Sequence, residues 1–196
     1  ELRERRRIAA AERKQRVLAE ALRDTAVAIS GTLSFTDVMD HMLSHIERVI
    51  RFDAVILLMI EDGRVWQARC RNLSDNKLET YSKDKFFPIQ KFSNLLLAFS
   101  RKDAVVIPFT HNYAGWVWDE DNLWVASNIT MPIVSHNAVI GFINLYSKEA
   151  GSYSEEDCAP LKVFASQAAV AIQNARLYES VQHLAIVDEL TGLYNR

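Results

Sequence analysis

Apolar side chains in the last part of the chain recur every three or four residues, which is the spacing of a helix face. A capping pattern opens this stretch, with Ser154 followed by three acidic residues. No glycine interrupts the chain from there to Gly192, so we expect one helix from about 155 to 187. One apolar stripe on this helix comprises Leu161, Phe164, Ala168, Ala171, Ala175, Tyr178, Gln182 and Ala185. A neighbouring stripe comprises Val163, Val170, Leu177, Val181 and Leu184.

Two apolar stripes on one helix need two partners, which we expect to be the domain's own sheet and a second copy of the helix. We assign the stripe from Leu161 to Ala185 to the paired signalling helix, because its small alanines allow two backbones to approach closely. Up to about Ala175, a single wide face buried in the domain core explains the same pattern equally well.

A heptad stripe at the N-terminus predicts another helix, over 1–31. We expect it to pair with its symmetry mate, with the terminal helix or with both, the alternative being an ordinary amphipathic helix that lies on its own domain. The two striped helices together predict a homodimer. The positions of the N-terminal stripe are Ile8, Ala11, Gln15, Leu18, Leu22, Thr25 and Ile29.

The middle of the chain has the pattern of a small sheet. A helix after Ser34 is followed by an apolar run at 54–60, short enough for a buried strand, and by a hairpin turn at Asp62-Gly63. The next strand alternates, so we expect its side chains to point to two opposite faces. One face carries Trp66, Ala68 and Cys70, and the other carries Gln67, Arg69 and Arg71.

A short helix, a strand and a hairpin complete this pattern, at about 92–99, 104–107 and 129–146. Within the hairpin, Pro132 predicts a sheet edge or a bulge, and Gly141 predicts a close approach of another backbone.

The segment at 109–123 gathers aromatic and acidic residues where the pattern predicts a loop. Aromatic side chains with a few polar groups are the usual lining of a small-molecule pocket. The alternative is that the same rings cover the core or fill a dimer contact. The candidate pocket residues are His111, Tyr113, Trp116, Trp118 and Trp124.

Composition excludes several classes of function. The chain has 196 residues, of which 49% are hydrophobic and 24% charged, which suits one soluble domain with helical extensions. A net charge of -2 predicts no contact with nucleic acid or an anionic membrane, and no apolar run is long enough to span a bilayer. Two cysteines, Cys70 and Cys158, form no disulfide framework, so we expect a cytoplasmic protein with free, small, buried thiols.

The sequence contains no arrangement that predicts catalysis. We find no nucleophile beside a base and no glycine-rich phosphate loop, so we expect no catalytic residue and no cofactor other than an unidentified small-molecule ligand. His41 and His45 have the spacing of a metal pair. They fall among polar residues and no third ligand is indicated, so we expect no metal site.

The order of these elements, together with three strings of residues, resembles the GAF domain over about 32–178. The strings are Met131-Pro132-Ile133, Ile140-Gly141-Phe142-Ile143 and Ala171-Ile172-Gln173-Asn174-Ala175-Arg176-Leu177-Tyr178. The resemblance implies an α+β fold, with an antiparallel sheet of five or six strands. It also implies that the first and terminal helices pack on one face and that a ligand cleft lies on the other.

The chain departs from two ligand-binding patterns of that family. Asn76-Lys77 is present, but the Phe-x-x-x-Asp-Glu element of cyclic-nucleotide binding does not follow it. Neither cysteine is followed by the histidine that is common at chromophore attachment sites. Cyclic GMP and a covalent chromophore are therefore disfavoured.

The last nine residues resemble the opening of GGDEF domains. The matching positions are Asp188, Leu190, Thr191, Gly192, Leu193, Asn195 and Arg196. The resemblance implies that a diguanylate cyclase domain begins here and that its GTP and magnesium sites lie beyond this chain.

We therefore divide the chain into an N-terminal coiled-coil-like helix (1–31), a GAF-like sensor domain (32–178), a linker helix (179–187) and the start of a truncated GGDEF domain (188–196). The expected function is sensory: the domain passes a small-molecule or upstream signal through paired helices to an output domain that makes cyclic di-GMP. The alternative is a ligand-free module for dimerisation and signal transmission between another sensor and a GGDEF domain, active or degenerate.

Overall fold

The computed structural model describes residues 35–71, 86–120 and 122–186. Its elements in chain order are α2 (Phe35–Val49), β1 (Ala54–Glu61), β2 (Arg64–Arg71), β3 (Phe87–Pro88), η2 (Ile89–Lys91), α3 (Ser93–Arg101), β4 (Val105–Ile107), η3 (Thr110–Asn112), β5 (Ser127–Ser135), β6 (Ala138–Ser147), η4 (Glu155–Asp157) and α4 (Cys158–Ile186). One compact unit, Met39–Ala169, contains the whole sheet. The part of α4 from Val170 onward belongs to a second unit. The predicted helix over 1–31 and the motif at 188–196 lie outside the described residues.

The sheet has six strands in the order β3-β2-β1-β6-β5-β4, and every neighbouring pair is antiparallel. Both predicted hairpins are present. Their turns, Asp62-Gly63 and His136-Asn137, have positive φ at both positions. That is the backbone of a type I′ turn, whose twist matches the twist of the strands that it joins. The α+β fold and the antiparallel sheet expected from the sequence are therefore confirmed.

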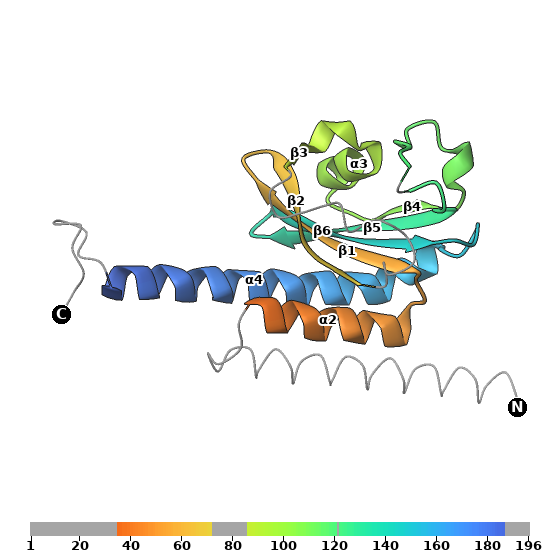
Figure 1. The fold of residues 1–196 in the computed structure, drawn as a ribbon. Helices are drawn as coiled ribbons and strands as arrows, with labels where there is room; N and C mark the ends of the chain where they lie inside the picture. Colours follow the sequence, from red (N-terminus) through yellow and green to blue (C-terminus); the bar gives the residue numbers. More distant parts are fainter. Residues whose placement is uncertain (1–34, 72–85, 121, 187–196) are drawn as a thin grey trace, which may run out of the picture. The chain divides into compact units, whose positions relative to one another are not determined.

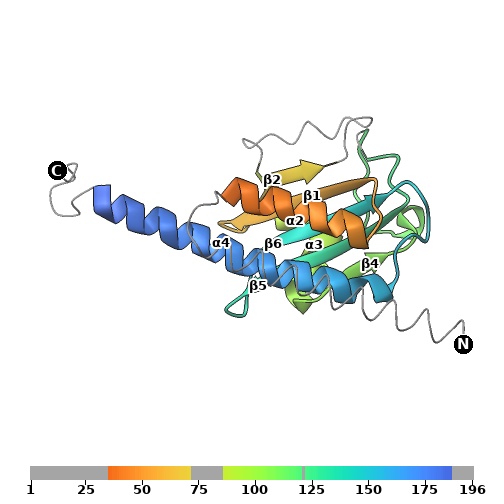
Figure 2. The ribbon, with the colours of Figure 1, turned by 90° about the horizontal axis from the view of Figure 1, so that it is seen from below.

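Helices and loops cover the two faces of the sheet differently (Figure 1). α2 and the beginning of α4 lie side by side on one face, as the view from below also shows (Figure 2). α3 and the segment before β5 lie on the other. The helix-covered face holds most of the largest fully buried side chains, among them Met39, Leu43, Ile46, Leu57, Ile129, Met131, Ile143, Leu145, Leu161 and Phe164.

The first part of the stripe that we assigned to helix pairing is buried in the domain core. Leu161, Phe164 and Ala168 are at most 1% exposed within their own domain, so they cannot contact a second copy. In the neighbouring stripe, Val170 and Leu177 are open to solvent, with 41% and 64% exposed, whereas Val163 is half-buried. The spacing of apolar residues identifies the apolar face of a helix but does not identify what covers that face, so the sequence could not distinguish a core contact from a dimer contact. The stripe positions Ala175, Tyr178, Gln182 and Ala185 have side chains outside the described part of the chain.

A β-bulge overturns the predicted alternation of β2. Leu57 of β1 pairs with Arg69 while Leu58 pairs with Gln67, so one residue of β2 is left over between them. An extra residue reverses the facing of every side chain beyond it. Arg69 therefore pairs with Asp40 of α2 at 3.4 Å, whereas Gln67 faces the opposite side of the sheet with Leu58.

Two special residues of the β5–β6 hairpin behave as predicted. A Cβ atom on Gly141 would lie 2.4 Å from the backbone oxygen of Leu58, so the neighbouring strand approaches as closely as only glycine permits. β4 pairs only with Asn128, Ile129 and Thr130 of β5. Pro132 therefore lies beyond the end of the β4 pairing, at a local edge of the sheet.

The predicted capping box at the start of the last helix is confirmed. The Ser154 backbone N–H donates to the Asp157 carboxylate at 2.9 Å, and the Glu156 N–H donates to the Ser154 hydroxyl at 3.3 Å.

No helix in the described part of the chain is both long and apolar enough to cross a bilayer.

The two cysteines have different surroundings. Cys70 is exposed, so the expectation that both thiols are buried is wrong for this residue. The Cys158 thiol donates to the Glu155 carboxylate at 3.6 Å. Burial, followed by the charge of Glu155, raises the pKa of this thiol to about 12. At neutral pH the proton therefore stays on sulfur, because the thiolate would lie half-buried beside a negative charge.

We expect Cys158 to react slowly while the protein is folded. In a Cys70→Ser variant, its reaction with DTNB at pH 8 should accelerate roughly 30-fold on unfolding in guanidinium, since the thiolate fraction rises while each thiolate becomes a somewhat weaker nucleophile. Stopped-flow absorbance measures the rate. Glu155→Gln should accelerate the folded reaction, and equal rates in the folded and unfolded protein would contradict the assignment.

Candidate ligand-binding site

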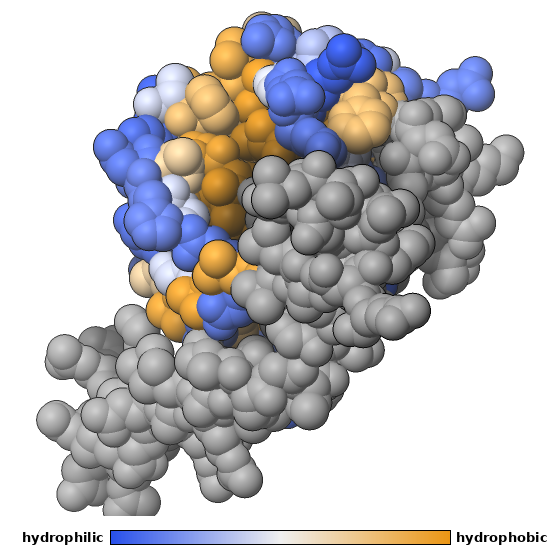
Figure 3. Space-filling view, turned by 90° about the vertical axis from the view of Figure 1, so that its left-hand side faces the viewer, coloured by the Kyte–Doolittle hydropathy of each residue, from blue (hydrophilic) through white to orange (hydrophobic). Residues whose placement is uncertain are grey.

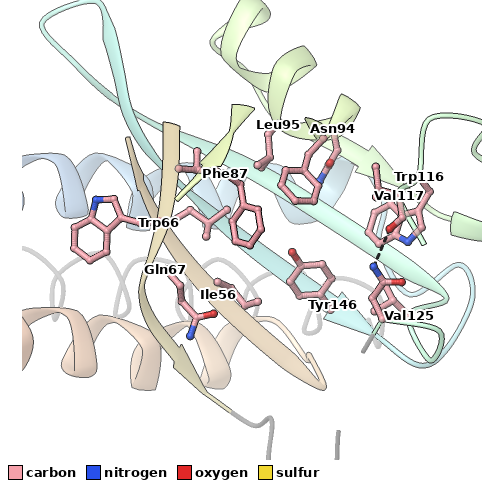
Figure 4. A pocket seen from close by; sticks show the side chains of 14 residues that line it. Ile56, Trp66, Gln67, Phe87, Asn94, Leu95, Trp116, Val117, Val125 and Tyr146 are labelled. Atoms are coloured by element: carbon pink, nitrogen blue, oxygen red, sulfur yellow. Dashed lines mark hydrogen bonds between the residues drawn. The ribbon is translucent and has the colours of Figure 1, made fainter. Parts of the chain in front are cut away.

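A cavity lies between the sheet and α3, on the face opposite α2 and α4 (Figure 4). The space that the centre of a water molecule can reach inside it is about 80 Å³. One water needs roughly 10–15 Å³ by this measure, so the cavity has room for several waters or a small organic molecule. The lining residues are Ile56, Leu58, Val65, Trp66, Gln67, Phe87, Phe92, Asn94, Leu95, Trp116, Val117, Asn122, Val125 and Tyr146.

The lining is mostly apolar and rich in aromatic rings. Trp116 and Tyr146 meet edge to face with ring centroids 6.4 Å apart, and Phe87 and Phe92 do so at 6.1 Å. Trp66 turns its ring away from the other lining side chains (Figure 4). On the face drawn in Figure 3, apolar residues gather in a hollow that polar residues flank. A concave, aromatic-lined space of this kind is the usual form of a small-molecule site.

Hydrogen bonds hold the aromatic segment over the cavity. The Ser93 hydroxyl, at the start of α3, donates to the Gly115 carbonyl at 2.6 Å. A Cβ on Gly115 would lie 2.4 Å from that same hydroxyl oxygen, so the contact requires glycine. Asn122 donates to the Val117 carbonyl at 2.8 Å and accepts from the Asp119 N–H at 3.2 Å. These bonds fix where Trp116 and Val117 enter the lining.

A buried polar cluster ties α3 to the sheet beneath the cavity. The Asn94 side chain donates to the Thr130 hydroxyl at 2.9 Å, and that hydroxyl donates to the Asn144 side-chain oxygen at 2.6 Å. Asn128 donates to the Leu145 carbonyl at 2.9 Å. Because a buried polar group is costly without a partner, this cluster determines the position of α3 over the strands.

Three buried polar atoms around the cavity have no hydrogen-bond partner among the described residues. They are the Gln67 Oε1, the Trp116 Nε1 and the Asn144 Nδ2. Gln67 and Trp116 line the cavity, and Asn144 lies two residues before Tyr146, on the same face of β6. Buried polar groups are nearly always paired in folded proteins, so these three are unusual.

The residues predicted from the aromatic segment have different places in the structure. Trp116 lines the cavity. The Tyr113 hydroxyl lies 3.4 Å from the Ser93 hydroxyl oxygen and donates to it, because the Ser93 proton goes to Gly115, and Tyr113 packs against the apolar cluster under α3. His111 and Trp118 contact each other with ring centroids 4.7 Å apart and ring planes tilted by 47°, and Trp124 packs on Ala54. None of these last four residues is part of the cavity lining.

Sequence reasoning missed most of the lining, including Gln67, Asn94 and Tyr146. One signal was available, because Asn128, Thr130 and Asn144 are polar residues that share a face in otherwise apolar strands. Such a pattern indicates a buried polar site on that face.

In the described part of the chain, no three His, Cys, Asp or Glu side chains come close enough together to hold a metal ion.

A family model for the GAF domain matches residues 32–173. Similar solved structures include the GAF domain of a phosphoenolpyruvate-protein phosphotransferase from Coxiella burnetii (TM-score 0.67, 14% identity, covering 83% of this chain and 96% of that one). The GAF domain of a two-component sensor histidine kinase from Bacillus halodurans is also similar (TM-score 0.63, 18% identity, 76% and 99% covered). So is the free methionine-R-sulfoxide reductase of Neisseria meningitidis in complex with its substrate (TM-score 0.63, 12% identity, 80% and 88% covered). None of the curated proteins matches the sequence significantly.

Proposed function

Since the chain belongs to the GAF domain family, we propose that it is the sensory part of a bacterial diguanylate cyclase and that its cavity binds a small molecule. In this proposal the chain itself carries no catalytic residue. Two copies pair through their terminal helices, and α4 passes the signal to a GGDEF domain that begins at Asp188. GTP and magnesium belong to that output domain.

The cavity is the observation that carries the proposal. It is apolar, aromatic and roofed by a segment that hydrogen bonds hold in place. The Neisseria reductase, an enzyme of similar fold, was solved with its substrate bound, so this fold is able to hold a small molecule. In a sensory domain, the binding of a small molecule in such a cavity is the simplest form of input signal.

β1 connects the cavity to α4. Ile56 and Leu58 line the cavity, while Leu57 and Met59, which alternate with them, are buried on the helix-covered face. A ligand that moves Ile56 or Leu58 therefore also moves Leu57 and Met59 in the buried layer of the helix-covered face. A ligand can shift an equilibrium between two arrangements only by its difference in affinity for them, and this strand gives it access to both faces.

The output domain is inferred from sequence alone. Seven positions between Asp188 and Arg196 match the opening of GGDEF domains. The Bacillus and Coxiella relatives are named as parts of a sensor kinase and a phosphotransferase, so domains of this fold serve proteins of different activities.

A cavity-filling substitution tests the proposal in the longer protein that contains the output domain. Val117→Phe adds a ring to the lining and should change basal cyclic di-GMP synthesis about 5-fold or more, since a conformational bias of about 1 kcal/mol suffices for that factor. Synthesis is measured by chromatography of the product.

Leu123→Phe is the matched control, because Leu123 lies in the same segment, is 61% exposed and is not in the lining. It should leave synthesis unchanged. If both variants behave as the unmodified protein, the cavity does not control the output. If the longer protein makes no cyclic di-GMP in any form, the assignment of the output domain fails.

The exposed apolar stripe on α4 favours a second candidate, a ligand-free module that dimerises and transmits a signal from elsewhere. Val170 and Leu177 are large apolar residues open to solvent, as expected of a helix that pairs with another. Native mass spectrometry separates the candidates. A mass above that of the chain indicates a retained ligand, whereas an empty dimer that no small molecule stabilises supports the transmission module.

A further inference from the structure

The polar atoms without partners restrict what the cavity can bind. The Trp116 Nε1 is a donor only, so it needs an acceptor from the ligand. The side-chain oxygen of Gln67 is buried and accepts hydrogen bonds, so it can pair with a donor on the ligand. Figure 4 shows these two side chains on opposite sides of Tyr146. A ligand that satisfies both therefore carries hydrogen-bonding groups at two separate points.

Charge restricts the ligand further. Among the described residues that line the cavity, none is charged. Lys91 lies close by, but its ammonium is over the rings of Phe87 and Phe92, at 5.1 and 5.5 Å from their centroids, and it is not part of the lining. An ion that enters an apolar space without a counter-charge loses its hydration with little in return.

The rings indicate the shape of the ligand. Phe87, Phe92, Trp116 and Tyr146 line the space, and the Phe87–Phe92 and Trp116–Tyr146 pairs each meet edge to face. Aromatic side chains pair favourably with another ring in offset or edge-to-face geometry.

We infer that the cavity binds an uncharged, ring-containing molecule, with an acceptor for the Trp116 N–H and a donor for the Gln67 oxygen, such as an aromatic amide. The inference rests on the proposed function and gives the class of ligand that the sensor takes.

Benzamide and benzoate test the inference, because they have the same size and shape and differ in charge. The full 196-residue chain is titrated with each, and binding is followed by saturation-transfer NMR and by thermal shift. Benzamide should bind with a Kd on the order of 1 mM, as expected of a fragment of this size. Benzoate should bind roughly 30-fold more weakly or not at all, because of the cost of burying its charge.

Two variants that remove a polar group and keep an apolar side chain in the lining test the polar contacts. Trp116→Phe removes the N–H and keeps a ring, and Gln67→Met keeps the length of the side chain and removes the carboxamide. Each should weaken benzamide binding about 5-fold, the usual effect of one hydrogen bond, and leave the binding of toluene unchanged. Trp118→Phe is the control, since Trp118 contacts Trp116 and does not line the cavity.

The outcomes separate this inference from the proposed function. If benzoate binds as well as benzamide in a Trp116-dependent manner, the ligand class is wrong and the sensory role stands. If toluene and benzamide bind equally in all variants, the polar recognition is wrong. If neither benzamide nor toluene binds near its solubility limit, the inference fails, while the response of the Val117→Phe variant still decides the sensory role.

Discussion

Phe164→Ala should lower the free energy of unfolding by about 3–5 kcal/mol, the usual cost of removing a large aromatic side chain from a packed core. Phe164 is 1% exposed within its own domain, so the deletion leaves a cavity that the surrounding strands and helices can fill only in part. Urea unfolding followed by circular dichroism measures the change.

Protein concentration distinguishes a core residue from a dimer contact. The loss caused by Phe164→Ala should be the same at low and high protein concentration, because the side chain packs within one copy. Val170→Ala is the matched control on the same helix and should cost within about 0.5 kcal/mol in the monomer, since Val170 is 41% exposed. A Phe164→Ala loss that disappears on dilution would restore this residue to the helix-pairing stripe.

Gly141→Ala should cost about 3 kcal/mol, an unusually large effect for the addition of one methyl group. The new Cβ would lie 2.4 Å from the Leu58 backbone oxygen, and backbone in a central strand cannot move aside as a side chain can. Separation of β1 from β6 would also shift Leu58 and Tyr146, both of which line the cavity. Benzamide binding should therefore weaken together with stability.

Gly63→Ala is the control for Gly141→Ala. Nothing lies within 4 Å of a Cβ added at Gly63, so its cost comes only from the left-handed backbone at φ 72° and should be about 1 kcal/mol. Guanidinium unfolding of both variants gives the comparison. Equal losses would mean that β1 and β6 separate easily at Gly141, and that the close strand approach has no energetic importance.

The sheet connects the two parts expected of a sensor, the ligand cavity and the helices that pass on the signal. Its cavity face carries a polar cluster and aromatic rings, and its helix face carries an apolar layer under α2 and α4. Both layers consist of side chains from the same strands. A ligand that displaces a strand backbone on the cavity face therefore also displaces the side chains on the helix face. Interiors this closely packed transmit displacement because they cannot absorb it.

The sequence by itself determined the kinds of element and their order. The apolar run of β1, the positive-φ turns and the cap at Ser154 depend on neighbours within a few residues, so local chemistry was sufficient to predict them. Gly141 and Pro132 could likewise be interpreted one at a time, since each residue type has few uses in a strand.

Only the tertiary structure decided what each face meets. The bulge in β2, which local alternation does not reveal, turned Gln67 toward the cavity and Arg69 toward α2. Periodicity gave α4 two apolar stripes, and three-dimensional packing placed Leu161, Phe164 and Ala168 of one stripe in the core. The cavity combines residues from Ile56 to Tyr146, and no sequence pattern spans that separation, because side chains so far apart in the chain become neighbours only when the sheet has formed.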